Sequence, residues 1–193
     1  MLHHGGLGAV LIWAGRVLSY FSSRVSEEDC QILDIQHGCN TAQQVLEALA
    51  ALVALRTWCP LWVNRRISLN MKTDNMTALA LVQTLKAKGP SLATIARDMS
   101  LDMGTSAYEP DIVEHLPGVM NKCADELSRE FEPDRKFTLP PVLSNATRSH
   151  PPLRTRCWWK ALPPTTSSSI QVGVGRSLNT CLFILLARIL GKR

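Results

Sequence analysis

The chain has 193 residues, 46% of them hydrophobic, which suits one ordinary globular domain and a further segment. Residues 1–130 carry 11 basic and 14 acidic side chains, whereas residues 131–193 carry 10 basic and 2 acidic ones, so the net charge of +5 arises in the last third. This asymmetry excludes a uniformly basic nucleic-acid-binding chain. We expect no transmembrane helix and no membrane partner, because every uncharged apolar run is shorter than about 18 residues. We also expect no secretory signal, because the apolar run over residues 5–14 is only about ten residues long and no basic segment precedes it.

The first predicted elements are strands. Short apolar runs at 8–13 and 17–21 flank Gly15-Arg16, and this spacing favours a β-hairpin. A weak alternation of apolar residues leads us to predict a third strand around residues 30–35.

The strongest helix signal covers residues 41–58. Its apolar residues recur at helical spacing in an Ala-rich background, Asn40 or Thr41 can cap its start, and Pro60 follows its end. Glu47 is the only carboxylate within it.

Two strand–helix units are predicted next. Residues 66–73 alternate as a strand, and Asp74-Asn75 ends this strand and can cap a helix over 76–86. Another helix over 91–103 begins after a Gly-Pro break.

A short strand over 111–116 and a last helix over 121–131, capped by Asn121, complete the predicted domain. This order predicts an α/β domain over residues 1–131, with a mixed sheet that is antiparallel at one edge and parallel toward the other.

Three acids occupy positions unusual for surface charges. Glu47 lies within an apolar helix, Asp74 where a strand ends, and Asp125 near a helix start. Acids that converge on one rim of an α/β sheet can bind Mg²⁺, and two such ions can assist an in-line phosphoryl displacement. The alternative for each is structural: a solvated helix glutamate, and an aspartate that terminates a strand or caps a helix.

The segment 115–129, which reads HLPGVMNKCADELSR, resembles the closing motif of type 1 RNase H domains in retroelement reverse transcriptases, including the gypsy-like ones. Residues 47–58 resemble the first long helix of that family, and residues 73–79 its strand-to-helix acid. The three motifs follow the order and spacing of the family over about residues 5–130.

The resemblance implies an RNase H fold, with a five-stranded mixed sheet flanked by helices. It also implies hydrolysis of RNA in RNA–DNA hybrids, with Mg²⁺ or Mn²⁺ bound by Glu47, Asp74 and Asp125. His115 matches a mobile histidine that assists proton transfer or product release in some members; the alternative is an edge-strand residue without a chemical role. Asn121 is interpreted as a helix cap and not as a ligand.

One acid of the family is missing. Residues 6–11 match the family's Gly-x-Gly-Ala-Val-Leu stretch, but the first metal-binding Asp would fall at Met1. Three carboxylates do not balance two divalent ions, so we expect weak or no hybrid cleavage. We interpret the chain as a truncated reading frame whose reverse transcriptase domain lies upstream, or as a decayed element. Without cleavage, the fold would remain as a non-catalytic nucleic-acid-binding remnant, or as a product that folds poorly.

Residues 132–193 are predicted to form a basic tail that is largely disordered, because seven of the eleven prolines lie between 133 and 164. Trp158-Trp159 among basic residues would suit base stacking and phosphate contacts, and a plain linker is the alternative. The resemblance implies a cytoplasmic or nuclear location.

Overall fold

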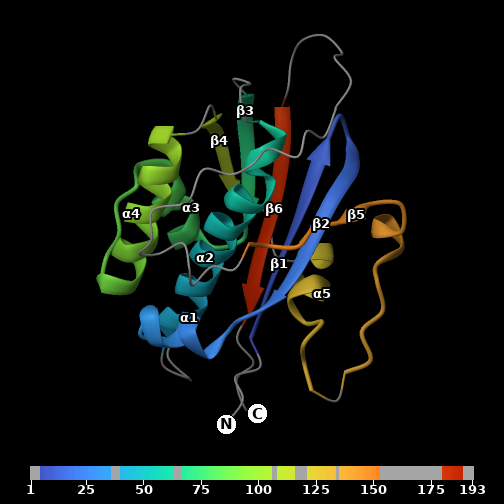
Figure 1. Ribbon diagram of the computed structural model, residues 1–193, viewed down its shortest axis with the longest axis horizontal. Coiled ribbons are helices and arrows are strands. Elements are labelled where there is room, and N and C mark those ends of the chain that lie inside the picture. Colours follow the sequence, from blue (N-terminus) through green and yellow to red (C-terminus); the bar gives the residue numbers. More distant parts are fainter. Residues whose placement is uncertain are drawn as a thin grey trace.

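The computed structural model describes residues 5–35, 40–62, 67–105, 108–115, 121–133, 135–152 and 180–188. These form a mixed α/β fold in which helices flank both faces of one sheet (Figure 1). The strands are β1 (Gly6–Trp13), β2 (Arg16–Arg24), β3 (Ile67–Thr73), β4 (Tyr108–His115), β5 (Thr147–Arg148) and β6 (Thr180–Arg188). The helices are α1 (Glu27–Ile32), α2 (Asn40–Trp58), α3 (Met76–Thr84), α4 (Pro90–Thr105) and α5 (Lys122–Ser128), with short 3₁₀ turns at Cys59–Leu61 and Pro141–Leu143.

The sheet is mixed, as predicted, with the strand order β4-β3-β6-β1-β2-β5. β1 pairs antiparallel with β2 and with β6, whereas β3 pairs parallel with β4 and with β6. The predicted hairpin is confirmed, and Ala14 (φ 48°) and Gly15 (φ 75°) form its tight left-handed turn. The described sheet has six strands, not the five we expected, because the C-terminal segment contributes two of them.

The third predicted strand, around residues 30–35, is wrong, because α1 begins at Glu27. The Ser26 hydroxyl accepts a hydrogen bond from the Asp29 backbone N–H at 3.0 Å, and the Asp29 carboxylate accepts one from the Ser26 N–H at 2.8 Å. This capping box and the acids in the first turn stabilise the start of a helix. They outweigh the weak alternation of apolar residues that favoured a strand.

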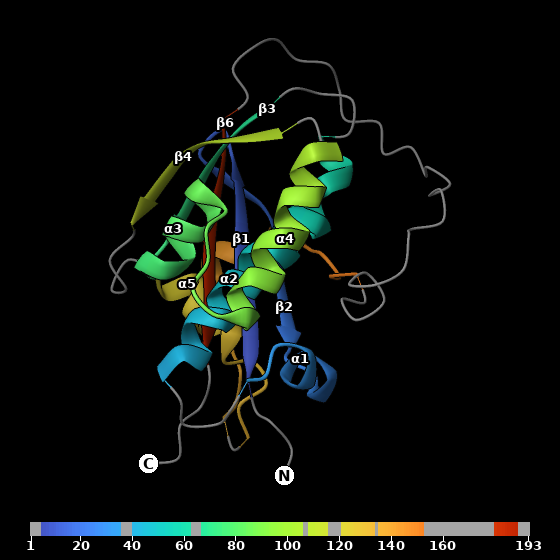
Figure 2. The same cartoon turned by 90° about the vertical axis from the view of Figure 1, so that its left-hand side faces the viewer.

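The long α2 helix is the centre of the core on one sheet face, where α1, α3 and α4 also lie (Figure 2). Its residues Ala48–Ala51 are fully buried, and the Trp58 ring lies 5.6 Å from the Phe21 ring of β2. By length and composition the segment Thr41–Leu61 would also be apolar enough to cross a membrane, but 67% of its most apolar window is buried inside the protein. We interpret it as a core helix.

The opposite face of the sheet is covered by α5 and by residues 135–148, which we expected to belong to the tail. Leu143 is fully buried in a second cluster with Val10, Tyr20 and Leu127. The Ser149 N–H donates to the Tyr20 carbonyl at 2.8 Å, where β5 joins the sheet edge. The predicted tail is therefore partly structured; residues 153–179, with Trp158-Trp159, lie outside the described residues.

An ion-pair cluster joins α2 to α4, and we expect its loss to destabilise the protein. Arg56 contacts Asp98 at 2.8 Å and Asp102 at 2.5 Å, and only 9% of the Asp98 side chain is exposed. Arg56→Met would remove the nearest counter-charge of both acids and leave Asp98 only the weaker influence of Arg97, so we expect a loss of about 2 kcal/mol in unfolding free energy by urea titration at pH 7. Arg16→Met, at an exposed site on β2, should change it by less than about 0.5 kcal/mol; equal losses would contradict the prediction.

Candidate functional site

The candidate site lies at the carboxyl end of β3, where the chain turns into α3. The Asn75 side chain caps α3, because its Oδ1 accepts hydrogen bonds from the backbone N–H groups of Thr77 at 2.8 Å and Ala78 at 3.2 Å. The cap function is therefore performed by Asn75 and not by Asp74. One carboxylate oxygen of Asp74, Oδ1, is buried and has no hydrogen-bond partner among the described residues.

Glu47 reaches this site from the middle of α2. Only 4% of the residue is exposed, so the alternative of a solvated surface glutamate is wrong. Its Oε1 accepts a hydrogen bond from the Gln43 amide at 2.7 Å, whereas its Oε2 is buried without a hydrogen-bond partner in the described part of the chain. Burial raises the pKa of Glu47 to about 7, and the nearby Asp74 carboxylate adds to this shift. The side chains of Gln43 and, to a smaller extent, Asn75 and Thr73 oppose it.

Asp74 connects the other acids electrostatically. Burial raises its pKa above the usual value, the neighbouring Asp125 raises it further, and His115 lowers it. Glu47, Asp125 and His115, which come from different elements of the chain, therefore each interact with Asp74 at one end of the sheet. Such a convergence at the carboxyl ends of strands is typical of sites in α/β folds.

His115 is the last residue of β4, directly beside the end of β3. The parallel pairing places His115 opposite Thr73, and its Nε2 lies 3.1 Å from the backbone carbonyl oxygen of Asp74. The side chain is exposed at the rim of the site.

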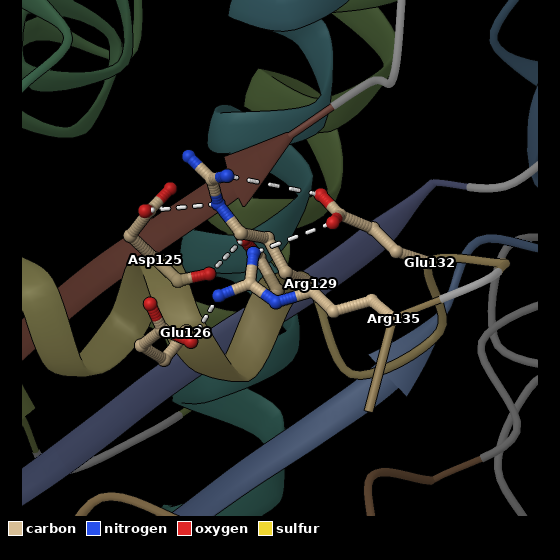
Figure 3. A network of polar contacts seen from close by, with 6 residues as sticks. Asp125, Glu126, Arg129, Glu132 and Arg135 are labelled. Atoms are coloured by element: carbon tan, nitrogen blue, oxygen red, sulfur yellow. Dashed lines mark hydrogen bonds and ion pairs between the residues drawn. The ribbon is translucent and has the colours of Figure 1, made fainter. Parts of the chain in front are cut away.

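Asp125 lies on the first turn of α5 within a chain of ion pairs (Figure 3). Its Oδ2 is 2.9 Å from Arg129 Nε, and the Nη1 atom of that arginine is 4.0 Å from Glu132 Oε1. Arg135 then bridges Glu132 at 3.3 Å and Glu126 at 2.5 Å. A cation at Asp125 would therefore share this carboxylate with Arg129 or displace the arginine.

Asn121 has a role that the sequence did not indicate. It occupies the N-cap position of α5, but its side chain makes no capping hydrogen bond and is fully buried. Instead, a side-chain hydrogen bond from Asn121 lowers the pKa of Asp74. An Asn in front of a helix is normally interpreted as a cap, so only the tertiary arrangement reveals the contact with Asp74.

The donor set fits one hard divalent cation better than two. Glu47 and Asp74 each have a buried oxygen without a partner, and Mg²⁺ and Mn²⁺ prefer such carboxylate oxygens. Within the described residues, however, no three acidic, His or Cys side chains are grouped closely enough to hold a metal ion as they stand. The arrangement thus offers two ligands, with Asp125 next to them but paired to Arg129.

Comparison of this chain with protein-family models, curated proteins and solved structures finds no match.

Proposed function

We propose that this chain is an RNase H-like domain that binds RNA–DNA hybrids with one divalent cation and cleaves them weakly or not at all. The observation that carries the proposal is the buried Glu47 carboxylate, whose unpartnered oxygen and raised pKa of about 7 accompany a second, half-buried acid, Asp74. A protein rarely places a buried carboxylate beside a half-buried one without a counter-charge, because both desolvation and repulsion oppose it. The resemblance of residues 115–129 to an RNase H motif is the basis for proposing an RNA–DNA hybrid as the substrate.

The residues of the site would have distinct roles. Glu47 and Asp74 would hold Mg²⁺ or Mn²⁺, and Asn121 would orient Asp74 by its hydrogen bond. Such a bound cation makes a coordinated water more acidic and neutralises phosphate charge. His115, exposed beside Asp74, would exchange a proton with solvent at the rim.

Two features support weak cleavage. The first is the pairing of Asp125 with Arg129, which occupies one oxygen of the third acid. The second is that, in the part of the sheet that the structure describes, no further acid is paired with the last residue of β3. The residues paired with Thr73 are His115 on β4 and Leu185 on β6, and neither is acidic. With Asp125 paired to Arg129, the remaining two carboxylates, Glu47 and Asp74, match the charge of one divalent cation and not that of two. A non-catalytic hybrid-binding domain is the second candidate, and the ion pair of Asp125 favours it.

We predict that Mg²⁺ and Mn²⁺ stabilise the purified chain and that Asp74→Asn abolishes this effect. At a concentration about ten- to a hundred-fold above the dissociation constant, one bound ion should raise the unfolding free energy by roughly 1–3 kcal/mol. Urea unfolding with and without the ion measures this. Asp34→Asn replaces an exposed acid outside the site and should leave the stabilisation intact; equal responses of the two variants would refute the cation site.

Hybrid binding and cleavage test the substrate class separately. With a labelled RNA–DNA hybrid and with DNA duplex of the same sequence, we expect tighter binding of the hybrid and little cleavage in Mg²⁺. Efficient cleavage that Asp74→Asn abolishes would overturn the weak-activity part of the proposal. Equal affinity for both duplexes would overturn the hybrid as substrate.

A further inference from the structure

The last strand that the structure describes, β6, occupies an interior position of the sheet. β6 lies between β1 and β3, as Figure 1 shows. It pairs antiparallel with β1 from Gly6↔Arg188 to Trp13↔Cys181, and parallel with β3 from Ser68↔Thr180 to Thr73↔Leu185. Both edges of β6 are therefore hydrogen-bonded along most of their length.

Removal of β6 would divide the sheet into two parts, β4-β3 and β1-β2-β5. Within each part the strands pair with one another without β6, through the tight β1–β2 turn on one side and the β3–β4 ladder on the other. The β1 and β3 edges would then face a slot for one strand, with unpaired backbone groups on both sides. Such edges readily accept a strand of suitable direction from any chain.

The sequence of β6 makes its insertion necessary. Between Thr180 and Arg188 it reads CLFILLA, without charge, Pro or Gly. A free segment of this kind associates with other strands, so β6 must be paired either in its own chain or in another.

We propose that β6 is exchangeable, and that the slot between β1 and β3 accepts the β6 of a second copy of this chain to form a strand-exchanged dimer. The β6 of a second copy has the same sequence and so offers the same register to both edges. The 27 residues 153–179 separate Pro152 from Thr180, and a chain of that length extends to at most about 90 Å, which is enough to reach a neighbouring copy.

In the exchanged dimer, the β6 of one copy would support the candidate site of the other. β6 pairs along β3 as far as Thr73, the residue before Asp74, so the copy that supplies β6 also supports the strand end that carries this acid. The proposal itself rests only on the sheet pairing and does not depend on the proposed function.

The protein concentration during refolding should determine whether the monomer or the strand-exchanged dimer forms. A linker of this length gives β6 an effective concentration of the order of 1 mM for its own slot, so the monomer should prevail after refolding at about 5 µM. After refolding at about 500 µM, we expect a substantial dimer fraction by size-exclusion chromatography with light scattering. This dimer should persist for hours after dilution, because its dissociation requires removal of an interior strand from the sheet.

A cross-link shows whether such a dimer is exchanged. In the full chain with Trp13→Cys, the new thiol lies opposite Cys181 in the β1–β6 ladder. Oxidation should join the two positions within one chain in the monomer and between chains in the dimer, as peptide mapping of the non-reduced protein would show. The control Trp13→Ser should lack this link. A dimer whose link stays within one chain, or a chain that remains monomeric after refolding at 500 µM, would overturn the proposal.

A second variant keeps the test decisive if Trp13→Cys fails to fold. Ile184→Pro in the full chain prevents β6 from completing its ladders and leaves the slot open. A synthetic peptide of residues 178–190 should bind this variant in a 1:1 ratio and should not bind the unmodified monomer, whose slot is filled. No binding by the folded variant would contradict the proposal.

Discussion

Replacing Glu47 with Gln should stabilise the cation-free protein at pH 8 by about 3 kcal/mol, although the residue lies at the centre of the candidate site. The pKa of Glu47 rises from 4.5 to about 7 on folding, chiefly because of burial. A shift of this size corresponds to about 3 kcal/mol, because each pKa unit is worth about 1.4 kcal/mol. Gln has nearly the same shape, and its carbonyl oxygen can still accept the hydrogen bond from Gln43.

The sign of the pH dependence follows from the direction of the shift. Because the folded state holds the proton more tightly, the Glu47 contribution is fully present below about pH 4.5 and is lost as the pH rises through about 7. The difference between Glu47→Gln and the unmodified chain should therefore be small at pH 4.5 and reach its full value at pH 8. Urea unfolding in EDTA at these two pH values measures it.

Addition of Mg²⁺ should reduce the difference in stability between the two proteins, because one bound ion should raise the unfolding free energy of the unmodified chain by roughly 1–3 kcal/mol. The unmodified chain gains a counter-charge for its buried carboxylate, whereas Glu47→Gln has lost that ligand and should respond weakly. Glu28→Gln, which changes an exposed acid on α1, should show neither effect. If Glu47→Gln is no more stable than the unmodified chain at pH 8 in EDTA, the buried charge is not the source of the expected pH dependence.

Gly8→Ala should destabilise the protein by about 2–3 kcal/mol, because β1 and α5 approach each other closely at this position. A Cβ atom on Gly8 would lie 2.6 Å from the Ala124 carbonyl oxygen and 2.8 Å from the Ser128 backbone nitrogen. Backbone atoms of a packed helix cannot move aside as a flexible side chain can, so α5 as a whole must shift. Because α5 carries Asp125, we also expect a weaker response to Mg²⁺.

Gly104→Ala is the matched control for this prediction. Gly104 lies in α4, and a Cβ atom there would meet nothing within 4 Å. The same substitution should therefore leave stability unchanged or raise it by up to about 1 kcal/mol, because Ala favours the helix. Thermal and urea unfolding of both variants provide the comparison. A loss of less than about 0.5 kcal/mol for Gly8→Ala would show that α5 can withdraw from β1 at little cost.

Features governed by neighbouring residues were predictable from the sequence. The hairpin, the long α2 helix, the strand before Asp74 and the Asn75 cap all occur where they were expected, with ends shifted by a few residues at most. α1 was missed although its signal is local, since Ser26 and Asp29 have the spacing of a capping box. Glu47, Asp74 and Asp125 could be identified as candidate site residues because each occupies an unusual position within its own element.

Contacts between distant segments could not be predicted in this way. The sequence placed Asn121 at a helix start, but only the tertiary structure turned its side chain toward Asp74. The raised pKa of Glu47 likewise depends on burial under other elements.

The charge and proline pattern of the last third indicated a tail. The structure instead places β5 at the edge of the sheet and β6 in its interior. The sequence CLFILLA does not indicate which strands β6 will pair with, because backbone hydrogen bonds are similar for any two strands. Its position depends on the two strand edges, of β1 and β3, that the rest of the fold leaves open. The sequence by itself thus determined the local elements and the candidate acids, and the tertiary structure decided which of them meet.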